Sequence, residues 1–114
     1  MKHSIGIFQG RLTKTKKKIL QKFPKNWTKE FFLAKKIGYN FIEYYLEEKY
    51  NTKNPFWSKQ GRKKIIRICK ENKLINYSAC FNFIIKQSIT TKKGERLIKK
   101  ALKISKKINI KKLI

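Results

Sequence analysis

The stretch SIGIFQGRLT, residues 4–13, decides the fold class, because a short apolar strand ends within it and does not turn straight back. Residues 4–8 predict a buried strand, and an amide, a glycine and a guanidinium follow at positions 9–11. A hairpin would more usually continue with Asn-Gly or Asp-Gly and a second strand. Here a polar, basic loop over 9–25 leads to a helix signal, so the sequence predicts a strand, a loop and a helix.

The first helix is predicted over 27–37. Its inner face combines Trp27, Phe31 and Ala34 at helical spacing, widened by Phe32 and Ile37. Further signals mark where it begins and ends: Asn26 or Thr28 as the N-cap, Glu30 in the first turn where the macrodipole favours an acid, and Gly38 after the last turn.

The same alternation continues to residue 114. Strands are also predicted at 40–46, 74–80 and 111–114, and helices from Ser58 to Asn72 and from Thr90 or Thr91 to Ile108. Strands that alternate with helices indicate an α/β fold with parallel strands and right-handed crossovers.

Three architectures fit this order: a three-layer α/β sheet, a flavodoxin-like domain and part of a (β/α)8 barrel. A phosphate loop is missing, which disfavours the flavodoxin-like domain. The sequence stops just after a fourth strand begins, which favours a partial TIM barrel. We therefore expect residues 1–114 to be the truncated N-terminal part of a barrel domain, with three βα units and the start of strand four.

The net charge of +25 suggests a nucleic-acid partner. However, 27 of the 31 basic residues are lysines, which are spread through every segment, and only four are arginines, the residue that base readout usually recruits. Lys, Ile, Asn, Phe and Tyr are all abundant and all have AT-rich codons, so nucleotide bias accounts for the composition. We expect nucleic-acid binding to be weak and nonspecific. A basic, non-enzymatic α/β protein that binds nucleic acid through distributed lysines is the alternative function.

Membrane and secretion signals are absent from the sequence. The apolar runs are far shorter than the roughly 20 residues of a membrane span, and no apolar segment follows the basic start. We expect a cytoplasmic protein without a membrane partner. Cys69 and Cys80 form no CxxC pair or zinc spacing, so both are predicted to be reduced thiols, buried or half-buried.

Candidate site residues lie at or near the carboxyl ends of the predicted strands, where ligands bind in both sheet and barrel α/β folds. They are Gln9, Arg11, Glu43, Cys80 and Asn82. Arg11 is suited to a phosphate or carboxylate, or is a solvated loop arginine. Glu43 interrupts an apolar strand, where a carboxylate needs a partner, so it is either an active-site acid or one half of a salt bridge to a lysine.

Several chemistries are excluded. The sequence has no GxGxxG, P-loop or GxSxG motif. It contains no Asp, and its single histidine, His3, precedes the first strand and lies at the wrong end for catalysis. Without Asp and with a single His, the chain cannot assemble a His/Asp/Glu metal cluster.

Taken in order, the motifs resemble a known family. The motifs are, in order, Ile5-Gly6-Ile7, Gln9-Gly10-Arg11-Leu12, Phe23-Pro24, Trp27 with Glu30-Phe31 and Ala34, Gly38, Ile42-Glu43, Asn54-Pro55 and Ser78-Ala79-Cys80. This series resembles the N-terminal part of sugar phosphate isomerases/epimerases of the xylose isomerase-like TIM-barrel superfamily, over about residues 4–114. A sister branch cleaves DNA at abasic sites with histidines after the second and third strands. Here Tyr44-Tyr45 and Phe81-Asn82 occupy those places, which counts against that branch.

The resemblance implies metal-assisted isomerisation or epimerisation of a sugar or sugar phosphate. It assigns Glu43 a catalytic role and Gln9, Arg11, Cys80 and Asn82 substrate-binding roles. The family's divalent metal is held by residues of later strands, which this chain lacks. We therefore expect a fragment of such an isomerase that binds no metal and is inactive by itself.

Overall fold

The computed structural model describes residues 3–13, 24–85 and 88–114, which form four strands, three α-helices and two short 3-10 helices. The elements are, in chain order, β1 (Gly6–Phe8), α1 (Trp27–Ile37), β2 (Phe41–Leu46), η1 (Pro55–Trp57), α2 (Lys59–Glu71), β3 (Ser78–Phe81), η2 (Asn82–Ile85), α3 (Lys92–Lys107) and β4 (Lys112–Leu113). The predicted alternation is confirmed, with β1, β3 and β4 shorter than expected. Most of the predicted loop, residues 14–23, lies outside the described residues.

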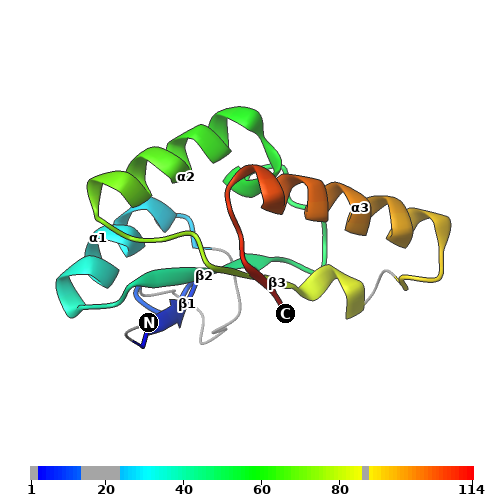
Figure 1. Ribbon diagram of the computed structural model, residues 1–114. Helices are drawn as coiled ribbons and strands as arrows, with labels where there is room; N and C mark the ends of the chain where they lie inside the picture. Colours follow the sequence, from blue (N-terminus) through cyan, green and yellow to red (C-terminus); the bar gives the residue numbers. More distant parts are fainter. Residues whose placement is uncertain (1–2, 14–23, 86–87) are drawn as a thin grey trace.

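All four strands form one parallel sheet in the order β1-β2-β3-β4. Figure 1 shows α1, α2 and α3 on one face of this sheet. The described residues therefore form two layers, one sheet and one set of helices, instead of the three layers that we weighed from sequence. The sequential strand order also differs from the flavodoxin-like order, which reverses within the sheet.

The core lies between β2 and the helices. Alternate residues of β2, namely Ile42, Tyr44 and Leu46, are buried on the helix side, as the strand period requires. The ring of Tyr44 lies 6.3 Å from that of Phe31 in α1 and 6.2 Å from that of Phe56 in η1, centroid to centroid. These aromatic contacts pack α1 and η1 against β2.

The buried thiol of Cys69 belongs to the same core. The Tyr44 hydroxyl lies 3.4 Å from Cys69 Sγ and also donates to Asn76 Oδ1. Burial raises the pKa of the Cys69 thiol, so it is protonated near neutral pH. Cys69 and Cys80 are free thiols, buried and half-buried respectively, which confirms the prediction for both.

Most of the predicted helix caps are present. Ser58 Oγ accepts a hydrogen bond from Gly61 N at 2.9 Å, and Thr91 Oγ1 accepts one from Gly94 N at 3.0 Å. Gly38 has a left-handed φ of 105° and donates to the last carbonyls of α1. Asn26 holds the N-cap position of α1, but its side chain makes no capping hydrogen bond.

The predicted inner face of α1 is too wide. Phe31 and Ala34 are fully buried, whereas Phe32 and Ile37 are each 59% exposed. The buried stripe of α1 therefore consists of Glu30, Phe31 and Ala34, and Phe32 instead lines an open hollow beside the end of α2. No helix of the described residues is long and apolar enough to cross a membrane.

Candidate functional site

The face of the sheet opposite the helices carries polar side chains near the carboxyl ends of the strands. Phe8 of β1 is the register partner of Glu43 in β2, and Ser78 of β3 hydrogen-bonds Glu43 from the other side. Tyr45 follows two residues after Glu43, so it points to the same face. We call this surface, made of Phe8, Glu43, Tyr45, Ser78 and Cys80, the helix-free face.

Glu43 is half-buried in the helix-free face. Ser78 Oγ donates to Glu43 Oε2 at 2.7 Å. Within residues 3–13, 24–85 and 88–114 no lysine or arginine forms an ion pair with Glu43, so the salt bridge that was the alternative to an active-site role is not found there. A neutral hydroxyl group thus meets the carboxylate's need for a partner.

Tyr45 connects the helix-free face to the segment after β3. Its ring lies 5.4 Å from that of Phe8, and its hydroxyl accepts a hydrogen bond from Asn82 Nδ2 at 3.0 Å. Burial, with a smaller contribution from the charges of Glu48 and Glu47, raises the pKa of Tyr45. The hydroxyl therefore stays neutral around pH 7 and can donate to a ligand.

Cys80 is half-buried beside Glu43. Burial and the negative charge of Glu43 both raise the pKa of the Cys80 thiol. Because a thiolate is the nucleophilic form, Cys80 is suited to lining a site and not to attacking a substrate.

β1 ends in a tight turn, residues 8–11, which we call the strand-end turn. Arg11 N donates to Phe8 O at 3.3 Å, and Gly10 has a left-handed φ of 91°. Gln9 continues the pairing of β1 with β2: its N donates to Glu43 O at 2.9 Å, and its Oε1 accepts from Tyr45 N at 3.0 Å. Gln9 is only 2% exposed and its side-chain oxygen is used within the protein, so the structure gives it the role of holding β1 against β2.

Glu30 fixes the strand-end turn to α1. It is fully buried, and its carboxylate accepts from Gly10 N at 2.9 Å with both oxygens and from Leu12 N at 3.1 Å. Burial raises the pKa of Glu30 in spite of these hydrogen bonds, which favour the ionised form. Sequence reasoning assigned Glu30 only to the helix dipole. The signal for more was its position on the buried side of α1, one residue before Phe31.

Arg11 lies between the two residues whose amides Glu30 binds. Its side chain is exposed, and its guanidinium carbon lies 5.8 Å from the centroid of the Phe8 ring. Phe8 is the register partner of Glu43, so a cation and a carboxylate flank the same ring at the edge of the helix-free face. This geometry suits a ligand that carries both an anionic group and hydroxyl groups.

Glu47 and Asn54 close the carboxyl end of β2. Asn54 Nδ2 donates to Tyr45 O at 3.0 Å and to Glu47 Oε1 at 3.3 Å, which gives the Asn-Pro motif a structural role. Glu47 Oε2 is buried without a hydrogen-bond partner among the described residues. Burial raises the pKa of Glu47.

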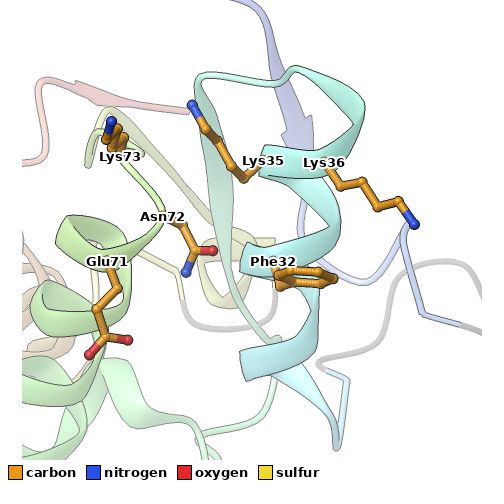
Figure 2. Close-up of a pocket in the computed structure, with 6 residues that line it drawn as sticks. All are labelled: Phe32, Lys35, Lys36, Glu71, Asn72 and Lys73. Atoms are coloured by element: carbon orange, nitrogen blue, oxygen red, sulfur yellow. The ribbon is translucent and has the colours of Figure 1, made fainter.

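A metal centre is not formed by the described residues, which contain no group of three or more His, Cys, Asp or Glu side chains suitably placed for an ion. Two open hollows lie on the helices instead. One, of about 440 Å³, separates the carboxyl ends of α1 and α2 (Figure 2). The other, of about 360 Å³, follows the outer side of α2.

Comparison with known proteins adds no relative: no family model matches this chain, and a search of the curated proteins finds no similar sequence. The site is therefore interpreted from its own geometry.

Proposed function

We propose that this chain is the N-terminal part of a TIM barrel related to the sugar phosphate isomerases/epimerases, in which the helix-free face lines the interior. One observation carries the proposal: the parallel strands follow one another in sequence order and all three α-helices of the described residues cover one face (Figure 1). In a TIM barrel the helices form an outer ring and the site residues come from the carboxyl ends of the strands.

The polar groups on that face support a ligand rich in hydroxyl groups. In this proposal Glu43 accepts a hydrogen bond from a sugar hydroxyl or a proton from carbon, and the Ser78 hydroxyl that bonds its carboxylate supports this role. Tyr45 and Asn82 offer neutral donors, and Arg11 offers a cation for a phosphate.

The divalent metal of the related isomerases does not fit the donors in this chain. Glu43 has the Ser78 hydroxyl as its partner, and the described residues hold no group of three ligating side chains. We therefore assign no metal-assisted step to these residues. We expect the chain to bind a sugar phosphate weakly and to need the rest of a barrel for turnover.

Ligand-observed NMR with a panel of pentose and hexose phosphates tests the proposal. We expect saturation transfer to at least one sugar phosphate with the wild-type chain, and a loss of binding of about tenfold or more in Glu43→Gln, because a neutral amide replaces the charged acceptor of the ligand's hydroxyl group. Glu71→Gln is the matched control, since Glu71 is exposed on α2. Binding that is equally strong in both variants, or absent from the wild type, would contradict the proposal.

A further inference from the structure

The hollow between α1 and α2 has no part in the proposed sugar site. Its walls are Phe32, Lys35 and Lys36 from α1 and Glu71, Asn72 and Lys73 from the end of α2. Figure 2 shows Asn72 directed from the α2 side toward α1, with Lys35 and Lys73 rising to the same end of the hollow. Two helices thus form opposite walls of one open channel.

The charge of this channel is positive. The residues that line it include three lysines and one carboxylate, Glu71, which already lies 3.7 Å from Arg67 Nε. Both helices end here, and their dipoles place partial negative charges at these ends. Each partial charge is about half an elementary charge, so the lysines of the channel outweigh them.

The second hollow extends the positive surface along α2. It is lined by Gln60, Lys63, Lys64 and Arg67, which recur at helical spacing and so form one stripe of the helix. Arg67 belongs to this stripe and pairs with Glu71 of the first hollow, so the two hollows are adjoining. Along the helix, the distance from Gln60 to Glu71 is about 16 Å.

An aromatic ring is exposed within this basic surface. Phe32 is 59% exposed and lines the hollow together with Lys35 and Lys36. A basic groove with an exposed aromatic ring is how proteins bind single-stranded nucleic acid without sequence preference, because every base has a face that stacks. In a duplex the bases are already stacked and cannot reach the ring.

We propose that this basic channel binds single-stranded nucleic acid, with phosphates on Lys35 and Lys73 and a base stacked on Phe32. The proposal is independent of the sugar site on the opposite side of the sheet. The alternative considered from the sequence was nonspecific binding through lysines distributed over the whole surface. Here binding is assigned to one site, the basic channel.

Two double variants of equal charge separate these possibilities. A fluorescein-labelled oligothymidylate of about 16 nucleotides is titrated with the full chain at several salt concentrations. In Lys35→Gln/Lys73→Gln we expect the slope of log affinity against log salt to fall by about 1.4, or about 0.7 for each lost phosphate contact. In the control Lys103→Gln/Lys106→Gln, on the exposed side of α3, the slope should stay unchanged. Equal slopes for the two double variants would overturn the proposal.

Phe32 provides the second test. Phe32→Leu keeps an apolar side chain but removes stacking, so affinity should fall about fivefold or more. Phe32→Trp should restore affinity, and its fluorescence should be quenched by the oligonucleotide. Circular dichroism checks that the helices persist, as expected for an exposed position. Unchanged affinity in Phe32→Leu would overturn the proposal, as would tighter binding to a duplex of equal length or to anionic lipid vesicles.

Discussion

The outer helical surface and the sheet side of this protein hold their carboxylates in different ways. The glutamates exposed on α2 and α3 each pair with a basic residue four positions away, as in Glu95 with Lys99 at 2.6 Å. By contrast, the buried carboxylate of Glu30 accepts only backbone amides of the described residues, those of Gly10 and Leu12. The first arrangement pairs a carboxylate with an opposite charge, whereas the second uses the carboxyl oxygens as acceptors that fix the backbone.

Glu43 and Glu47 extend the comparison. Their hydrogen-bond donors are the Ser78 hydroxyl and the Asn51 and Asn54 amides. Neutral donors of this kind orient a carboxylate without cancelling its charge. Although the chain has a net charge of +25, the donors to Glu43 and Glu47 among the described residues are thus neutral groups.

The largest effect is expected at Glu30. Glu30→Ala leaves the amides of Gly10 and Leu12 without an acceptor inside the protein, so the free energy of unfolding should fall by about 3 kcal/mol. Urea unfolding followed by circular dichroism measures this loss. Glu71→Ala, on the exposed side of α2, is the control and should change stability by less than about 0.5 kcal/mol. Similar losses in both variants would remove the distinction between the two surfaces.

The acidity of Glu30 gives a second prediction. Its folded-state pKa is raised above the usual value of 4.5, so the folded protein binds the proton more tightly than the unfolded chain does. The stability of the wild type relative to Glu30→Gln should therefore be highest below pH 4.5 and decline as pH rises through the raised pKa. Carboxyl ¹³C NMR titration locates that pKa directly. A midpoint for Glu30 below the usual value of 4.5 would contradict this sign.

The order of the elements was predictable from sequence because each helix carries its own period and end signals. Gly38, Ser58 and Thr91 mark helix ends by local chemistry, which depends on few distant contacts. The outward position of Phe32 was not predictable, because an apolar period does not reveal how narrow the contact with the sheet is.

The candidate site was predictable only in outline. The rule that parallel strands open at one end indicated the strand-end turn and Glu43. The partners of these residues were not predictable, because Glu30 and Ser78 lie 20 and 35 positions away from the groups they bind. Contacts over such separations depend on strand register and helix placement, which a single sequence does not display.

Ser78 should show an intermediate effect. Ser78→Ala removes the hydroxyl that donates to Glu43 Oε2, at a position that is only 1% exposed, so stability should fall by about 1 kcal/mol. Ser105→Ala is a matched control: Ser105 is also buried, but its hydroxyl bonds to the carbonyl of Ala101 within α3. Because alanine favours a helix, the control should be close to neutral. Equal losses of stability in Ser78→Ala and Ser105→Ala would mean that the hydrogen bond from Ser78 to Glu43 adds nothing to the stability of the fold.

The smallest effect is expected at Glu95, where the ion pair with Lys99 is shortest. Both side chains are mostly exposed, at 56% for Glu95 and 73% for Lys99, so water and salt screen their attraction. The pair lowers the pKa of Glu95, so any stabilisation exists above the usual value of 4.5 and is lost as pH falls. At neutral pH and physiological salt, the urea midpoints of Glu95→Gln and the wild type should coincide within error. If Glu95→Gln lost as much stability as Ser78→Ala, the short distance would outweigh exposure, and the two surfaces would not differ in how much their carboxylates contribute to stability.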